Sequence, residues 1–127
     1  MTQCPEFGTL ECVKPLSFNK STLLFIRNQS TELRKEVGEA LRDIQKGVLP
    51  GLPLSRPMPS VGSGVYELRV GDSAKSIRVF YFIKFEDAIL VFHAFEKRTQ
   101  KTPPHEIEIG KNKLKELLYG KDQRNYR

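Results

Sequence analysis

Three segments in the second half of the chain are rich in apolar residues that would fall on alternate faces of a strand at a period of two, and they constrain the fold more than any other feature. They cover residues 65–70, 76–84 and 88–95, separated by the turn-rich segment 71–75 and by a polar turn at Glu86 and Asp87. This period is typical of strands that bury one or both faces. In the middle segment, Ile77, Val79, Tyr81 and Ile83 share one face, and Arg78, Phe80 and Phe82 share the other. The sequence therefore predicts an antiparallel meander.

A second pattern, upstream of these strands, has the period of a helix. Apolar residues recur there at steps of three and four, namely Leu33, Val37, Leu41, Ile44 and Val48. Ser30 suits the N-cap of this amphipathic helix, and Gly47 suits its C-terminal stop. Before it, residues 15–18 can form a first strand, and Ser21 can begin a brief helix that runs through Ile26.

The segment from Leu49 to Gly64 is rich in proline and glycine, which disfavours a helix or a central strand. We interpret it as a loop. A linker between two domains is the alternative, but each half of the chain is too small to stand alone. We expect a flexible lead-in over residues 1–13, one domain over residues 14–120 and a tail over residues 121–127.

The last ordered element is predicted to be a helix that is capped by Thr102, begins with Pro103 and Pro104, and ends at Gly120. Its buried stripe would consist of Ile107, Leu114, Leu117 and Leu118. Helices and strands that follow one another in this way indicate an α/β protein of the α+β type, with a mainly antiparallel sheet.

The chain has 127 residues and a formal net charge of +6, which favours a polyanionic partner such as RNA, DNA or an acidic protein segment. From Gly64 onward there are 13 basic against 9 acidic residues, compared with 8 against 6 before it. Contacts with an anion are therefore expected mainly in the second half of the chain.

Several classes of protein are disfavoured by what the sequence lacks. Cys4 and Cys12 have the spacing of neither a zinc site nor a redox pair, and suit free thiols in a reducing cytoplasm. No signal peptide and no apolar run of roughly 20 residues is present, so we expect a soluble cytoplasmic protein. A phosphate-binding glycine loop, paired metal ligands and a nucleophile elbow are also absent, and we expect neither a metal nor a cofactor.

Two arginines are candidates for binding a phosphate group. A hairpin with residues 72–75 in its turn would place Arg69 directly opposite Arg78 on one face of the sheet. Two like charges in that position are unfavourable unless an anion or an acid lies between them. The alternative is a structural pairing with acidic side chains, with Glu67 as the candidate partner of Arg78.

Histidine and lysine residues near the end of the third strand extend this candidate site. His93 is expected on the face of Ile89, Val91 and Phe95, and suits either a structural hydrogen bond or proton transfer during RNA cleavage. His105 follows two prolines and is more typical of a structural or exposed residue.

A short basic segment follows, in which Lys97, Arg98 and Lys101 are either a solvated loop or the rest of a positive pocket beside Arg69 and Arg78. The aromatic residues are interpreted mainly as core, although one exposed ring could stack on a base. They are Tyr66, Phe80, Phe82 and Phe95.

Three segments then resemble a known family: 64–69 with its Glu-Leu-Arg, 77–81 with its Arg-Val-Phe-Tyr, and 91–103 with His-Ala-Phe-Glu-Lys-Arg-Thr-Gln-Lys-Thr-Pro. Together they resemble the phage-derived HigB-like branch of the RelE/ParE toxin superfamily, over about residues 14–118. Arg98 stands where the family more often has lysine. The resemblance implies two N-terminal helices packed on a curved, mainly antiparallel sheet, followed by a C-terminal helix.

The resemblance also implies a function, that of an mRNA interferase. Such a toxin is a metal-independent endoribonuclease that inhibits translation by cutting mRNA, often on the ribosome, through attack of the ribose 2′-hydroxyl on the adjacent phosphate. Arg69 and Arg78 would then stabilise the transition state with support from Lys97 and Lys101, Arg98 would add charge for binding RNA, and His93 would act as general acid or base.

A protein partner is implied as well, a small antitoxin with a helix-turn-helix domain that would cover the basic face or displace the last helix. Two other functions remain open. One is a ParE-like toxin that binds DNA gyrase and cleaves nothing, and the other is a passive nucleic-acid-binding protein.

Overall fold

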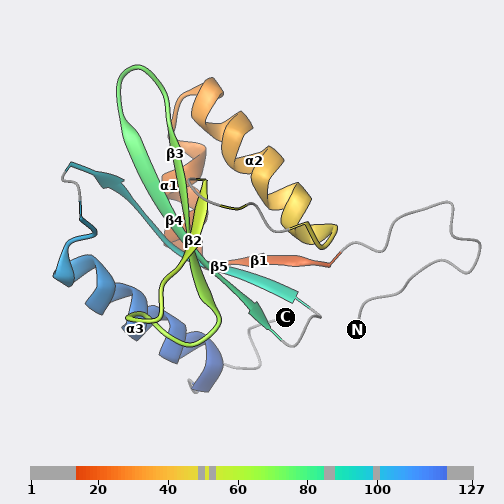
Figure 1. Ribbon diagram of the computed structural model, residues 1–127, viewed down its shortest axis with the longest axis vertical. Coiled ribbons are helices and arrows are strands. Elements are labelled where there is room, and N and C mark those ends of the chain that lie inside the picture. Colours follow the sequence, from red (N-terminus) through yellow and green to blue (C-terminus); the bar gives the residue numbers. More distant parts are fainter. Residues whose placement is uncertain (1–13, 49–50, 52–53, 85–87, 99–100, 120–127) are drawn as a thin grey trace, which may run out of the picture.

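A five-stranded mixed sheet with helices on both faces organises the chain in a computed structural model (Figure 1), which describes residues 14–48, 51, 54–84, 88–98 and 101–119. The predicted α+β class is confirmed. The elements in chain order are β1 (Leu16–Phe18), α1 (Lys20–Arg27), α2 (Thr31–Gln45), β2 (Ser55–Pro57), β3 (Val65–Gly71), β4 (Ser76–Lys84), β5 (Ala88–Lys97) and α3 (Pro104–Tyr119).

The strands lie in the order β1-β5-β4-β3-β2. The predicted antiparallel meander of β3, β4 and β5 is confirmed and forms the centre of the sheet. The strand β1 is added to β5 in parallel, a pairing that the sequence did not reveal.

The prediction of a loop over residues 49–64 is wrong at one place, because β2 lies within that segment and pairs antiparallel with β3. β2 has only three residues and is an edge strand. Pro57, which has no backbone N–H to donate to the sheet, is tolerated in an edge strand.

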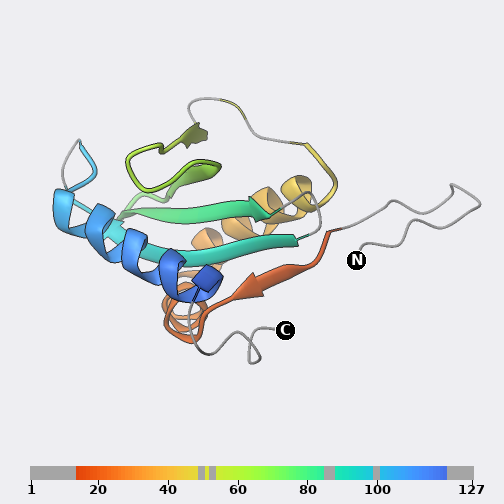
Figure 2. The same ribbon diagram turned by 90° about the horizontal axis from the view of Figure 1, so that it is seen from below.

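Helices lie on both faces of the sheet (Figure 2), and each face has its own apolar core. The α2 core joins α1 and α2 to one face, and its largest members on the sheet include Tyr81, Leu68 and Ile77. The α3 core joins α3 and the segment before β3 to the other face; its buried members are Met58, Val61, Val65, Phe80, Phe92, Phe95 and Leu114. The predicted apolar stripe of α3 belongs to this second core, with Ile107, Leu117 and Leu118 partly buried.

The N-terminal helices begin close to where the sequence placed them. Ser30 caps α2 as predicted, since its side chain accepts a hydrogen bond from the N–H of Leu33 at 3.1 Å. Gly47 follows the helix with φ +92°, the left-handed conformation that glycine adopts without strain. Two details differ: Val48 lies beyond the helix and is 57% exposed, and α1 begins at Lys20 with Asn19 as its cap instead of at Ser21.

The predicted face of His93 is wrong because β5 contains an irregularity opposite β4. Phe80 pairs with His93 but the next residue, Tyr81, pairs with Val91, so that Phe92 has no partner position. An extra residue of this kind is a β-bulge, and it moves all later side chains to the opposite face. Ile89 and Val91 therefore lie in the α2 core, while His93 lies beneath α3.

At the bulge, the backbone carbonyl of Phe92 accepts a hydrogen bond from Asn19, the residue that caps α1. Asn19 donates a hydrogen bond from Nδ2 to the carbonyl of Phe92 at 2.8 Å, and its Oδ1 accepts from the N–H of Thr22 at 3.0 Å. The side-chain amide of Asn19 therefore caps α1 and also supplies a hydrogen-bond donor to the Phe92 carbonyl, as partly buried backbone groups require.

Several predictions lie outside the described residues. These are the lead-in with Cys4 and Cys12, the turn at Glu86 and Asp87, the end of the last helix at Gly120 and the tail over residues 121–127. Residues 99 and 100, between Arg98 and Lys101, are also outside them.

Candidate functional site

Arg69 on β3 and Arg78 on β4 stand directly opposite each other, as the sequence predicted. The register is set by the turn at residues 72–75, where the N–H of Asp72 donates to the carbonyl of Lys75 at 2.9 Å. The side chain of Asp72 also accepts from the backbone N–H groups of Ala74 and Lys75, each at 2.9 Å, which is a common way for aspartate to stabilise a tight turn. These bonds lower the pKa of the Asp72 carboxyl, so the turn holds its charge.

A buried carboxylate lies between the cations of neighbouring strands. Glu67 on β3 has a side chain only 1% exposed, and its Oε1 accepts from Nε of Arg56 at 3.3 Å and lies 4.0 Å from Nε of Arg78. The structural pairing of Arg78 with Glu67 is therefore present, although it is long. Nε of Arg78 is buried with no hydrogen-bond partner, while Nη1 donates to the carbonyl of Ile77 at 3.1 Å.

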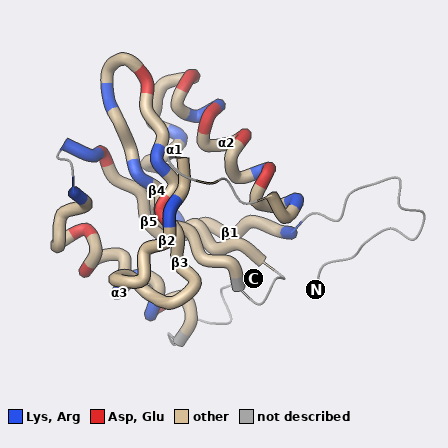
Figure 3. The backbone as a smooth tube through the Cα atoms, viewed as in Figure 1, with Lys and Arg blue, Asp and Glu red and all other residues tan. Residues whose placement is uncertain are grey.

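Lys97 at the end of β5 shares the electrostatic field of this group. Burial lowers the pKa of its ammonium, and the positive charge of Arg78 lowers it further; Glu67 raises this pKa in part, and Arg69 and Arg56 lower it by less. We call Arg56, Arg69, Arg78 and Lys97, together with Glu67, the cation cluster. Figure 3 shows basic positions on β2, β3 and β4 close to one another. Four cations surround one carboxylate, which leaves the group with an excess of positive charge.

The remaining basic residues of the predicted pocket are placed differently. Arg98 has a side chain 79% exposed and is ion-paired with Glu96 at 3.4 Å, so it lies on the surface. Lys101 is also exposed, one residue before Thr102. The structure thus brings three of the predicted residues together, namely Arg69, Arg78 and Lys97.

Two members of the site were not predicted as such. Arg56 lies on β2, in the segment interpreted as a loop, and only recognition of that edge strand would have placed it beside Glu67. Thr102 was expected to cap the last helix, but its hydroxyl donates to Oε2 of Glu67 at 2.6 Å. The carbonyl of Pro103 accepts from the first N–H groups of α3, those of Glu106 and Ile107.

His93 belongs to a separate cluster under α3. It is 5% exposed, its Nε2 lies 2.7 Å from Oε1 of Glu106, and its Nδ1 lies 3.2 Å from Nζ of Lys113. Lys113 in turn donates to the hydroxyl of Ser21 on α1 at 3.2 Å. We call His93, Glu106, Lys113 and Ser21 the histidine cluster. The charged groups that act on His93 are Lys113, Glu106 and His105, and none of them belongs to the cation cluster.

The partners of His93 determine its protonation. An ammonium can only donate, so Nδ1 must accept from Lys113 and the ring proton must lie on Nε2, where it is donated to Glu106. A second proton on Nδ1 would face the ammonium of Lys113. Burial lowers the pKa of His93, although the hydrogen bond to Glu106 raises it in part. The imidazole is therefore neutral, and both of its nitrogens are engaged with α3.

The aromatic residues separate the two clusters. The ring of Phe80 lies 5.6 Å from those of His93 and Phe95, and Phe95 is the residue that pairs with Arg78. Tyr66 stacks on Tyr81 at 5.5 Å on the opposite face, toward α2. Phe82 is only partly buried. His105 is exposed, with Nε2 3.3 Å from Glu106, which fits the role expected for it.

The described residues contain neither a metal-binding group nor a membrane-spanning helix. No group of three or more His, Cys, Asp or Glu side chains in that part of the chain could hold a metal ion. None of the helices described there is long and apolar enough to cross a membrane.

Fold and site together define a small α+β protein with an excess of buried and half-buried cations on one face of a mixed sheet. The chain belongs to a family described as phage-derived protein Gp49-like, whose model matches residues 24–115. These residues include all of the cation cluster and most of both cores.

Comparison with other proteins adds a structural likeness. The structure is similar to a double arginine-to-alanine mutant of the Escherichia coli toxin RelE in the free state, with a TM-score of 0.49 and 15% sequence identity, over 84% of this chain and 99% of that one. No curated protein matches the sequence.

Proposed function

We propose that this protein is the toxin of a toxin-antitoxin system and a metal-independent endoribonuclease that cleaves mRNA, on the ribosome. The observation that carries the proposal is the cation cluster, in which Arg78 is held nearly buried beside Arg69 and Lys97 on adjacent strands. Membership of a phage-derived family and the sequence resemblance to HigB-like toxins agree with it.

The proposed reaction is attack by a ribose 2′-oxygen on the neighbouring phosphorus. The bond from phosphorus to the 5′-oxygen breaks, which leaves a cyclic phosphate and a free 5′-hydroxyl. The 2′-hydroxyl loses a proton and the departing 5′-oxygen gains one. Negative charge accumulates on the phosphate oxygens in the transition state, so fixed cations in a partly desolvated site lower the barrier.

Each cation suits a distinct part of that task. Arg78 has a buried side chain whose orientation is set by Glu67 and by the carbonyl of Ile77, so it is preorganised to stabilise the transition state. Arg69 is half-buried and is not ion-paired with any described acidic residue, which suits direct binding of a phosphate oxygen.

Proton transfer is better assigned to Lys97 than to His93. The pKa of Lys97 is lowered by burial and by Arg78, which makes its ammonium a stronger acid toward the departing 5′-oxygen. The sequence suggested His93 as the general acid or base, but both of its ring nitrogens are hydrogen-bonded to side chains of α3, Glu106 and Lys113. We propose that His93 positions α3 and that Lys101 and Arg98, both exposed, bind the RNA backbone beyond the cleaved linkage.

A toxin of this kind requires a neutralising partner, and we propose an antitoxin with a helix-turn-helix domain. Its contact surface should be acidic where it meets the cation cluster, because like charges there would be repelled.

The test is controlled expression in bacteria, followed by mapping of mRNA 5′ ends. The natural chain should stop growth and create new 5′ ends that depend on translation, and Arg69→Ala and Arg78→Ala should abolish both effects. Purified protein that has been dialysed against a chelator should retain its activity on translating ribosomes. Growth arrest with DNA damage and intact mRNA would indicate a gyrase poison instead, and harmless expression would indicate a passive binding protein.

A further inference from the structure

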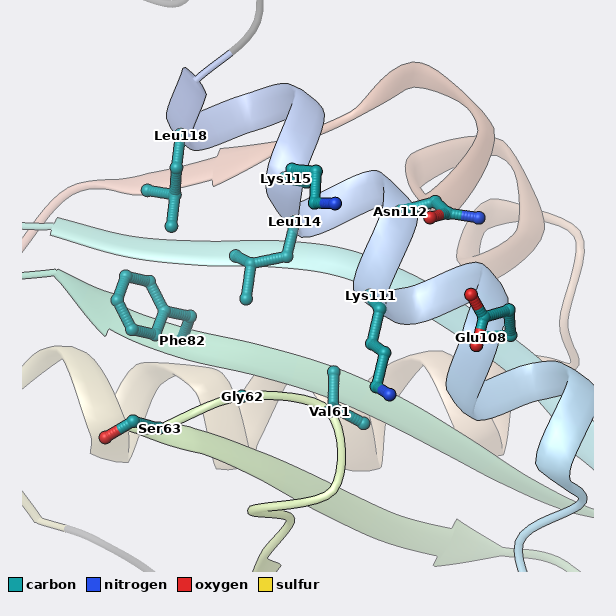
Figure 4. A pocket seen from close by; sticks show the side chains of 10 residues that line it. All are labelled: Val61, Gly62, Ser63, Phe82, Glu108, Lys111, Asn112, Leu114, Lys115 and Leu118. Atoms are coloured by element: carbon teal, nitrogen blue, oxygen red, sulfur yellow. The ribbon is translucent and has the colours of Figure 1, made fainter.

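A cleft of about 570 Å³ opens beside α3, away from the cation cluster (Figure 4). Its walls are the segment 61–63, the ring of Phe82 on β4, and the side of α3 that carries Leu114 and Leu118. The volume lies in the range of sites that bind small organic groups. The polar side chains around it are those of Ser63, Glu108, Lys111, Asn112 and Lys115.

The middle of α3 packs closely on the sheet, whereas its C-terminal half borders the cleft. A Cβ atom on Gly110 would lie only 2.8 Å from the ring of Phe80, so the missing side chain lets the helix approach the sheet there. One turn further on, Leu114 is 7% exposed, while Phe82 and Leu118 are only partly buried. Apolar surface, including one aromatic ring, is therefore left accessible between the helix and the loop.

The charges at the rim favour an anionic occupant. Lys111 and Lys115 lie one helical turn apart and are both exposed, and neither is ion-paired within the described part of the chain. Among the residues that the structure describes, Glu108 is the only acidic one that lines the cleft. Two ammonium groups on the helix and an accessible aromatic ring across the cleft match a nucleotide, with phosphates for the lysines and a base for the ring.

The cleft lies on the same side of the sheet as the proposed RNA site. Arg78 and Phe82 lie on the same face of β4 four residues apart, which corresponds to about 13 Å along a strand. α3 extends past both places, because Thr102 just before it binds Glu67 and Leu118 near its end lines the cleft. Because Gly110 packs on Phe80 between the two places, an RNA strand held by the cation cluster would reach the cleft over the outer surface of α3.

We infer that the cleft is a nucleobase subsite for single-stranded RNA, in which a base packs against Phe82 while Lys111 and Lys115 contact the adjoining phosphates. The inference rests on the proposed function, since it assumes that RNA is bound at the cation cluster. It adds a place that recognises a base, whereas the cation cluster contacts only the backbone.

The experiment uses a tryptophan in the cleft. The natural chain contains no tryptophan, so Phe82→Trp gives a single fluorophore. The probe is an oligouridine methylated at every 2′-oxygen, which the proposed reaction cannot cleave. The intact oligomer should quench the tryptophan. An oligomer that lacks the base at one position should bind about tenfold more weakly and, at the correct position, leave the fluorescence unchanged. A methylated dinucleotide, which reaches only the cation cluster, should not quench.

A second measurement does not depend on the tryptophan variant. The double variant Lys111→Ala, Lys115→Ala should bind the oligomer about three- to tenfold more weakly, with a salt dependence that is reduced by about 0.7 for each lost phosphate contact. Lys35→Ala, an exposed lysine on α2 on the other side of the sheet, is the matched control and should bind normally.

The outcomes separate the two proposals. Binding that depends on Arg69 but neither quenches the tryptophan nor responds to Lys111 and Lys115 overturns the base subsite and leaves the nuclease proposal intact. An oligomer that the natural protein does not bind at all overturns the subsite, whereas the proposed function is overturned only if expression creates no new mRNA 5′ ends.

Discussion

The cation cluster and the histidine cluster lie on the same face of the sheet but differ in their balance of charge. In the first, four cations surround Glu67, and one donor, Nε of Arg78, is buried without a hydrogen-bond partner. In the second, Lys113 and Glu106 flank a neutral imidazole, and every nitrogen of His93 is engaged. Phe80 and Phe95 separate the two.

The difference indicates two roles for polar groups beneath one helix. A cluster whose hydrogen bonds are all satisfied holds its elements together, and here it joins α3 to β5 and, through Ser21, to α1. A cluster with surplus charge is stable only when solvent or a ligand compensates it, so it is suited to binding an anion. If this distinction holds, substitution of His93 should affect mainly the stability of the fold, and substitution of Arg78 should affect mainly the binding and cleavage of RNA.

The largest effect is expected from Glu67→Ala. Removal of this carboxylate leaves Arg78 nearly buried without a counter-charge and removes the acceptor of Thr102, which should lower the free energy of unfolding by about 3–5 kcal/mol in urea denaturation. Glu67→Gln keeps an acceptor for Thr102, so its free energy of unfolding should fall by less than that of Glu67→Ala. A Glu67→Ala protein as stable as the natural chain would show that water, not Glu67, compensates the guanidinium.

Arg78→Ala should have the next largest effect, on cleavage instead of stability. Loss of one preorganised donor at the transition state should slow cleavage by about 100- to 1,000-fold, measured with folded protein on a defined mRNA. Arg42→Ala is the matched control, because that arginine is exposed on α2, on the other side of the sheet. Equal losses in the two variants would mean that general positive charge, not the cluster, is what cleavage needs.

His93→Ala should lower stability and leave the chemistry of the folded protein nearly unchanged. The variant loses a 2.7 Å hydrogen bond to Glu106 and the packing of the ring on Phe80, which should cost about 1–3 kcal/mol of unfolding free energy. His105→Ala, at an exposed position, is the control. A fall in the cleavage rate of fully folded His93→Ala as large as that of Arg78→Ala would restore His93 to the chemistry and remove the distinction between the clusters.

The sequence predicted the cation cluster better than the histidine cluster, for a geometric reason. A four-residue turn between two alternating strands determines the register of a hairpin, so the position of Arg69 opposite Arg78 follows from the residue numbers alone. Lys97 was expected only in a basic segment after the strand; β5 in fact extends to Lys97, which lies two residues after Phe95 and therefore on the same face.

Two features could not be read in the same way. The residues around the bulge, Phe92, His93 and Ala94, are compatible with either face, so nothing in the local pattern reveals the extra position, and the predicted face of His93 was wrong. Arg56 lies among prolines that hide a three-residue edge strand. Each of these places is contacted by a residue from another part of the chain. Asn19 binds the carbonyl of Phe92 at the bulge, and Glu67 accepts a hydrogen bond from Arg56.

The smallest predicted effect is a dependence of stability on pH that comes from His93. Burial first, and the charge of Lys113 in addition, lower the pKa of the folded-state imidazole below its ordinary 6.5. The unfolded chain therefore takes up a proton on this residue before the folded chain does, and stability should decrease as the pH falls below 6.5, by at most about 1.4 kcal/mol per pH unit for one proton. Urea denaturation of the natural chain and of His93→Gln, at several pH values between neutrality and the range where carboxylates titrate, measures this slope. The glutamine can still donate to Glu106 but cannot be protonated, so its slope should be shallower. Identical slopes would mean that His93 is protonated as readily in the folded protein as in the unfolded chain, which the ammonium of Lys113 at 3.2 Å from Nδ1 should prevent.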